Sequence, residues 1–119
     1  MEKPHKKLDV WKLSMDLVVE IYKITKFLPP EEKYNLTSQI KQAAISIPAN
    51  IAEGAASTKK EFANFLHISQ GSLSELDTHL EAAQLLGFMK KDDLKNADEL
   101  MNRTDKMLTG LIRKQKGSF

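Results

Sequence analysis

The sequence predicts an all-α fold, an antiparallel up-down-up-down four-helix bundle, and three observations support it. Apolar residues recur at steps of three and four along most of the chain, which is the period of a helix with one buried face. Sustained strand-like alternation and the Asn-Gly or Asp-Gly pairs of hairpins are absent from the sequence. Three short connections interrupt the pattern, and short connections make neighbouring helices antiparallel.

Composition is typical of one globular domain spanning residues 1–119. Hydrophobic residues make up 41% and charged residues 29% of the 119, and the net charge is only +2. The absence of cysteine excludes disulfides and thiolate metal sites, and it fits a reducing, cytoplasmic location. The polar first residues do not resemble a signal peptide, and no apolar run approaches the ~20 residues of a membrane span, so no membrane contact is expected.

The first helix is predicted over residues 9–28 and carries more apolar surface than one buried face needs. Its core stripe is Leu13, Leu17, Ile21, Ile24 and Leu28, and a second stripe beside it is Trp11, Met15, Val18 and Tyr22. Proline removes a backbone donor, so Pro29 and Pro30 end the helix. Exposed apolar patches usually mark contacts, and we therefore expect the second stripe to form the interface of a homo-oligomer.

The second helix is predicted over residues 31–54, with Glu31 and Glu32 at the positive end of its dipole. Pro48 lies inside it and should kink it or open one hydrogen bond. A polar face runs through Gln39, Gln42, Ser46, Asn50 and Glu53. That face is either simply solvated, or Asn50 and Glu53 satisfy backbone groups that Pro48 leaves free. We expect Pro48, Asn50, Glu53 and Gly54 to form a structural motif, with Gly54 near the helix end.

Helices three and four are predicted over residues 59–86 and 92–115. Thr58 and Glu61 form a capping box at the start of the third, and Gly87 followed by Phe88 forms a left-handed C-cap. Asp92 is expected to cap the fourth helix.

No arrangement in the sequence resembles an enzyme site, and we predict a protein without catalytic residues, metal or cofactor. His67, Glu75 and His79 share one face of the third helix, but a bundle di-iron site needs Glu-x-x-His pairs on two helices, and none occurs within the four predicted helices. The hydroxyls of this helix, such as Ser72, are not spaced to pair with a base. An enzyme with a site between subunits stays open as an alternative.

The positive charges cluster by topology. In an up-down-up-down bundle, both termini and the turn between helices two and three lie at one end. That end collects Lys3, Lys6 and Lys7, Lys59 and Lys60, and Arg113, Lys114 and Lys116, partly offset by Glu2, Asp9, Glu53 and Glu61. Lys6, Lys7, Lys59, Lys60, Arg113 and Lys114 are therefore candidate contacts for RNA or DNA, although these side chains also serve simply to solvate the chain ends.

The stretch from Gln39 to Gly54, with its Ser-Ile-Pro-Ala-Asn-Ile-Ala-Glu-Gly run, resembles the signature of the 23S rRNA intervening sequence protein family. Phe62 to Leu66, Gly71 to Leu73 and Leu85 to Phe88 are similar to its second half. The family pattern is often basic where this chain has Gln42. The resemblance implies a four-helix bundle and a barrel-like homopentamer, and it extends to accessory proteins of diversity-generating retroelements, which bind nucleic acid and a reverse transcriptase.

These observations leave two main functions open. One is a non-catalytic nucleic-acid-binding or adaptor oligomer, whose partners are further copies of itself, RNA or DNA, and a second protein. The other is a protein–protein interaction scaffold with no nucleic-acid role.

Overall fold

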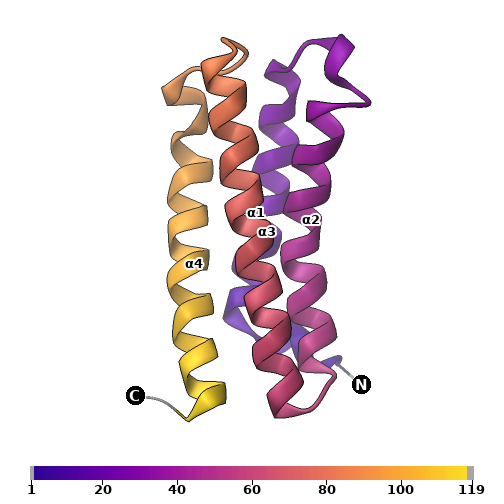
Figure 1. Ribbon diagram of the computed structural model, residues 1–119, viewed down its shortest axis with the longest axis vertical. Helices are drawn as coiled ribbons and strands as arrows, with labels where there is room; N and C mark the ends of the chain where they lie inside the picture. The colour runs from indigo at the N-terminus through magenta and orange to yellow at the C-terminus, as the bar shows by residue number, and fades with distance from the viewer. Residues whose placement is uncertain (1, 118–119) are drawn as a thin grey trace.

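The computed structural model describes residues 2–117, and its core is four long helices packed side by side (Figure 1). The helices are α1 (Asp9–Ile24), α2 (Leu36–Ala55), α3 (Lys59–Leu85) and α4 (Lys95–Lys116). Successive helices run in opposite directions, and α1 closes the ring by packing on α4 as well as on α2. The predicted all-α four-helix bundle is confirmed.

The two ends of the bundle are built from different connections. The N- and C-terminal segments and the α2–α3 turn lie at one end, and the α1–α2 and α3–α4 connections lie at the other (Figure 1). A short 3-10 helix, η1 (Pro4–Lys7), precedes α1. This topology brings segments that are far apart in the sequence to a common surface.

The core consists of one apolar stripe from each helix. Its fully buried members include Leu17, Ile21, Ile40, Ile47, Ile51, Leu66, Leu76, Leu80 and Leu108. Three hydroxyls are equally buried, and each donates to a helix carbonyl: Ser14 to Trp11 at 2.7 Å, Thr104 to Leu100 at 2.7 Å, and Ser69 to Ile47 at 2.9 Å. The buried polar atoms are thereby satisfied without loss of packing.

Two helix boundaries on the first connection differ from the prediction. α1 ends at Ile24 rather than at residue 28, and the chain tightens into the 3-10 turn η2 (Thr25–Phe27). Pro29 disfavours helical backbone at the residue before it, and Leu28 is extended, with φ −80° and ψ 141°. The α helix therefore stops before the prolines.

α2 begins at Leu36 rather than at residue 31. Pro30–Glu32 forms a separate 3-10 turn, η3, and Asn35 has non-helical backbone, with φ −129° and ψ −104°. The Glu32 carboxylate accepts a hydrogen bond from the Leu36 N–H at 3.3 Å. The acidic residue expected inside the helix instead satisfies one of its first free N–H groups.

The caps of α3 follow the prediction in part. The Thr58 hydroxyl accepts from the Glu61 N–H at 3.3 Å, but the Glu61 carboxylate accepts from that hydroxyl, at 2.9 Å, rather than from the Thr58 N–H. At the other end Gly87 has a φ of 83°, and the Phe88 N–H donates to the Ala83 carbonyl at 2.9 Å. This is the predicted left-handed C-cap.

The start of α4 differs from the prediction. A 3-10 turn, η4 (Lys91–Leu94), precedes the helix, which begins at Lys95 rather than at residue 92. The Asp93 carboxylate, not that of Asp92, accepts the N–H of Lys90 at 2.8 Å. Because the turn starts at Lys90, the residue three positions later has the capping geometry.

Pro48 does not interrupt α2, which remains helical from Leu36 to Ala55. Proline has no N–H, so it withdraws the donor for the Ala44 carbonyl. The side-chain donors nearby act on other carbonyls: the Asn50 amide donates to Ser46 at 2.8 Å, and Ser69 of α3 donates to Ile47. The bond from Ser69 ties α3 to α2 at the proline.

At Gly54, α2 packs closely against α3. A Cβ at this position would lie 2.7 Å from the Phe65 Cβ and 2.9 Å from the Phe62 Cδ1. Real Cβ contacts are not that short, so only glycine fits without moving the helices. The helix continues to Ala55, and Gly54 therefore serves packing rather than ending the helix.

Candidate nucleic-acid interface

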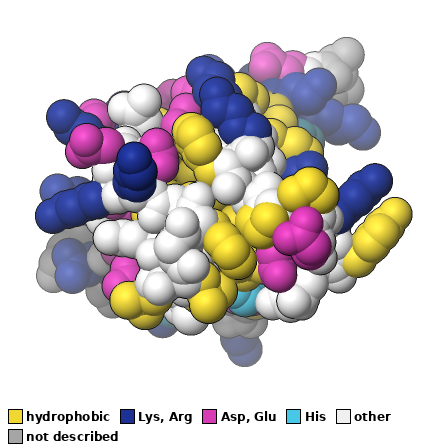
Figure 2. Space-filling view, turned by 90° about the horizontal axis from the view of Figure 1, so that it is seen from above, with side chains coloured by type: hydrophobic (Ala, Val, Ile, Leu, Met, Phe, Trp, Pro, Cys, Tyr) yellow, Lys and Arg dark blue, Asp and Glu magenta, His cyan; other side chains and the backbone are white. Residues whose placement is uncertain are grey.

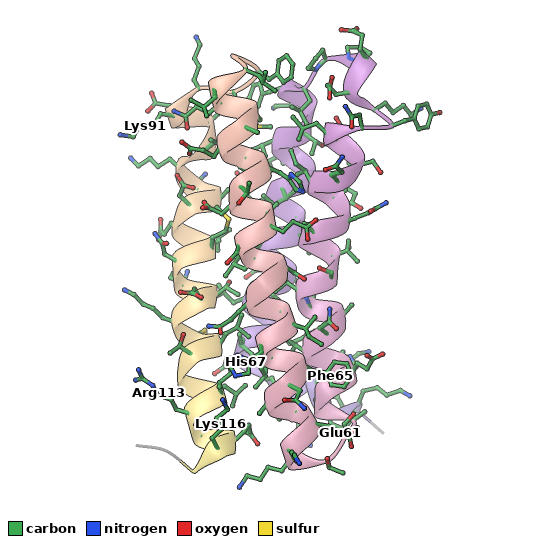
Figure 3. The ribbon with its side chains drawn as sticks, in the orientation of Figure 1. Glu61, Phe65, His67, Lys91, Arg113 and Lys116 are labelled. Carbon is green, nitrogen blue, oxygen red and sulfur yellow. The ribbon has the colours of Figure 1, made fainter. Side chains whose placement is uncertain are left out.

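The fold brings the predicted basic residues to one end of the bundle. Lys6 and Lys7 lie in η1, Lys59 and Lys60 open α3, and Arg113 and Lys114 lie in the last turns of α4. Their segments meet at the end that carries both termini, where Figure 3 labels Arg113 and Lys116. All six side chains are exposed. We call these six residues the basic end.

The basic end is not neutralised by ion pairs. Within residues 2–117, the one pair of a basic and an acidic side chain at ion-pair distance is His79 and Glu75, 3.3 Å apart on α3, and neither belongs to the basic end. The carboxylates of Asp9, Glu53 and Glu61 are exposed, and Glu61 is held by the Thr58 hydroxyl. The ammonium and guanidinium groups of the basic end therefore remain available to an external anion.

Helix dipoles act in opposite senses on four of the six residues of the basic end. Arg113 and Lys114 lie at the C-terminus of α4, where positive charge is favoured. Lys59 and Lys60 lie at the N-terminus of α3, where positive charge costs about 0.3–1 kcal/mol per residue at an exposed site. Stability alone therefore does not account for two lysines in the first turn of α3.

The opposite end mixes charges of both signs. Figure 2 looks down on this end and shows Lys or Arg, Asp or Glu, and hydrophobic side chains interspersed. Lys90 and Lys91 are followed there by Asp92 and Asp93, and Glu31 and Glu32 are followed by Lys33. The molecule is therefore asymmetric in charge although its net charge is only +2.

The predicted interface stripe on α1 is only partly at the surface. Met15 and Tyr22 are 36% and 44% exposed, whereas Trp11 packs against the core and lies 5.0 Å from the His5 ring. Val18 belongs to the core, with 8% exposure, so its assignment to the stripe was wrong. The neighbouring Val19 is exposed instead, at 64%. The spacing 15, 19, 22 is itself helical and was the signal that the sequence analysis missed.

The two polar residues of the predicted structural motif, Asn50 and Glu53, differ in their contacts. Asn50 is half-buried and bonded to the Ser46 carbonyl, as described above. Glu53 is exposed. Within residues 2–117 its side chain makes no hydrogen bond, whereas its backbone carbonyl accepts from the Ser57 hydroxyl at 2.9 Å. The supporting role expected of both residues thus has a visible contact only for Asn50.

The histidines of α3 do not converge on a common centre. His67 is exposed near the lower end of α3 (Figure 3), and His79 lies beside Glu75, 3.3 Å away. Within residues 2–117, no three His, Asp or Glu side chains are grouped so that they could hold a metal ion. In the same range, no helix is both long and apolar enough to cross a membrane.

An acidic groove between α3 and α4 was not anticipated. Ser74, Asp77 and Thr78 of α3 face Asp98 and Asp105 of α4 across it. Partial burial raises the pKa of the Asp98 carboxyl above its ordinary value of 3.8, and repulsion from Asp77 and Glu81 adds to the rise, while Lys91 opposes it. This flank of the bundle therefore carries negative side chains, in contrast to the positive basic end.

Comparison with known proteins places this fold in a family. The model of the 23S rRNA-intervening sequence protein family matches residues 6–110. The chain belongs to that family. The match runs from η1 into the second half of α4 and includes the Pro48 region and both cap motifs of α3.

A solved structure has the same fold as this family member. It is the 1.70 Å crystal structure of a protein of unknown function from the S23 ribosomal protein family of Bacteroides thetaiotaomicron. The two are 25% identical, with a TM-score of 0.79 over 87% of this chain and 98% of the other. No curated protein matches the chain. Neither the family nor the neighbour is described as an enzyme.

Proposed function

We propose that this protein is a non-catalytic, homo-oligomeric nucleic-acid-binding protein whose basic end contacts the phosphate backbone. The observation that carries the proposal is the basic end itself: six exposed cations from three distant segments, outside any ion pair within residues 2–117. The family name adds support, since it refers to intervening sequences of an RNA.

The position of Lys59 and Lys60 strengthens this proposal. Two lysines at the positive end of a helix dipole repel that dipole, and a bound phosphate relieves the repulsion. The first free N–H groups of α3 then add hydrogen-bond donors to the same phosphate. The start of α3 should therefore be the centre of the contact, with η1 and the end of α4 beside it.

Binding of this kind neutralises phosphates and releases counterions. It should tolerate any nucleotide sequence and weaken steeply with salt, because no base edge needs to be read. The functional test is a titration of duplex RNA at low salt with a variant in which all six residues of the basic end are glutamine. We expect the variant to lose most of its affinity. No binding by the parent, or equal binding by the variant, would refute the proposal and leave the protein–protein scaffold as the function.

Oligomer formation is the second part of the proposal. Met15 and Val19 lie one turn apart on α1 and are exposed. An exposed apolar pair of this kind is typical of a subunit contact. The family resemblance favours a pentamer, which would multiply the basic end around a ring.

The oligomer is tested by light scattering at micromolar concentration. Val19→Glu should dissociate it, because a charge would be buried at the contact. Leu85→Glu is the matched control, since Leu85 is a similarly exposed apolar residue at 80% but lies at the end of α3. A monomeric parent, or an oligomer unchanged in Val19→Glu, contradicts this part of the proposal.

A further inference from the structure

A second surface, separate from the basic end, lies between α1 and the first half of α2. It is a groove of about 640 Å³, lined on one side by Tyr22 of α1 and on the other by α2 residues such as Lys41 and Ile45. Lys33 and Tyr34, from the connection between the two helices, line it as well. The α1–α2 connection lies at the end of the bundle opposite the termini (Figure 1).

Each tyrosine of the groove is paired with a lysine. The Lys41 Nζ lies 4.8 Å from the centre of the Tyr22 ring, and the Lys33 Nζ lies 5.4 Å from the centre of the Tyr34 ring. Both distances are within the range of a cation–π contact. The pair of Lys41 and Tyr22 joins two helices, so the fold, rather than chain proximity, sets the ammonium beside the ring.

All charged side chains that line the groove are positive. Two lysines line it, and no carboxylate does. The nearby Glu32 is engaged elsewhere, because its carboxylate accepts from the Leu36 N–H at 3.3 Å and from the Asn35 amide at 3.2 Å. An anionic ligand therefore meets two cations in the groove without an opposing lining charge.

The aromatic rings are open to a ligand. Tyr34 is 88% exposed and Tyr22 is 44% exposed, although both belong to the same groove. A nearly bare tyrosine adds little to folding stability, since burial of its ring is what stabilises. Exposed aromatic faces beside lysines are the combination that binds single-stranded nucleic acid, with bases stacked on rings and phosphates at ammonium groups.

We propose that this groove binds single-stranded RNA, with bases stacked on Tyr22 and Tyr34 and phosphates held by Lys33 and Lys41. The hydroxyls of Thr37 and Ser38 and the amide of Gln42 also line it and can hydrogen-bond a 2′-hydroxyl, which favours RNA over DNA. A duplex is excluded from stacking, because its bases are already stacked inside the helix. This inference adds the class of nucleic acid to the proposed function, but it does not depend on the basic end.

The experiment titrates the full chain with a fluorescein-labelled oligouridylate of about ten nucleotides, within the range of single-strand binding sites. Tyr34→Ala and Tyr22→Ala should each weaken binding by about ten-fold, the effect of losing one base–aromatic stack. Tyr34→Phe keeps the ring and should bind like the parent. Oligodeoxyuridylate should bind more weakly than the RNA.

Phe27→Ala is the matched control. Phe27 is also exposed, at 41%, with the Lys26 Nζ 5.3 Å from its ring centre, but it does not line the groove. Its loss should leave oligouridylate affinity unchanged. Duplex RNA affinity should be the same in the parent and in Tyr34→Ala, since the duplex is assigned to the basic end.

Several results would refute RNA binding in the groove. These are a parent that binds no oligouridylate, tyrosine variants that bind like the parent, or a Phe27→Ala variant that loses as much affinity as Tyr34→Ala. If the tyrosine variants dissociate the oligomer in light scattering, the groove is a contact between copies and the inference is wrong. Loss of oligouridylate binding only in the six-glutamine variant refutes the groove and keeps the basic end. Loss of oligouridylate binding only in the tyrosine variants supports the groove, and the basic end is then tested separately by the duplex titration.

Discussion

Replacing Gly54 by alanine tests how closely α2 and α3 pack. The new Cβ would lie 2.7 Å from the Phe65 Cβ and 3.4 Å from the Phe62 Cα. Neither atom is the end of a flexible side chain, so the helices themselves must separate. Overpacking of this kind costs about 1–3 kcal/mol.

The helical preference of alanine over glycine offsets part of that cost, by about 1 kcal/mol. We therefore expect Gly54→Ala to lower the free energy of unfolding by as much as about 2 kcal/mol, which corresponds to a fall in melting temperature of as much as about 8 °C for a domain of this size. Thermal unfolding followed by circular dichroism measures it.

Gly71 supplies the matched control within α3. It is exposed, and an added Cβ meets no heavy atom within 4 Å. Gly71→Ala should therefore stabilise by about 0.5–1 kcal/mol. A Gly54→Ala variant that melts at or above the parent temperature would refute the close packing described here, whereas opposite signs for the two variants are expected.

Three further variants test individual contacts. Asn50→Ala should lower the free energy of unfolding by about 1 kcal/mol, because the Ser46 carbonyl loses its side-chain donor, and denaturation by urea measures the change. Ser69→Ala should cost about 1–3 kcal/mol, because the bond to the Ile47 carbonyl is buried, and an unchanged urea midpoint would show that the bond does not stabilise. Asp98 has a raised pKa in the folded chain, so its ionisation opposes folding as pH rises above its ordinary value of 3.8. Asp98→Asn should therefore melt above the parent at neutral pH and lose that advantage below pH 3.8, and an equal difference at both pH values would contradict this sign.

The fold was predictable because the apolar period is continuous within each helix. The core stripe through Leu17 is buried as expected, and the C-cap at Gly87 forms. The periodicity did not locate the start of α2, because Leu36 depends on the backbone of Asn35 and on the Glu32 carboxylate. Helix ends are decided by such local contacts, which a repeating pattern does not encode.

The surfaces were predictable only as far as topology determines them. The up-down-up-down order was enough to bring Lys59 and Arg113 to one end. The predicted stripe on α1 contained Val18, whereas Val19 is the exposed residue. Adjacent side chains on a helix point in directions about 100° apart, so an error of one position exchanges a core residue for a surface residue. The pair of Lys41 and Tyr22 depends on how two helices pack, so neither stretch of sequence reveals it alone.

The most direct test of the central claim is the salt dependence of duplex DNA binding for the parent and two double variants. Lys59→Gln with Lys60→Gln removes two cations from the basic end, and Lys90→Gln with Lys91→Gln removes an adjacent pair from the opposite end. We expect a steep parent plot of log affinity against log salt, a slope reduced by about one unit per lysine in the first variant, and an unchanged slope in the second. Equal slopes for all three proteins, or a larger loss in the second variant, would contradict phosphate binding by the basic end.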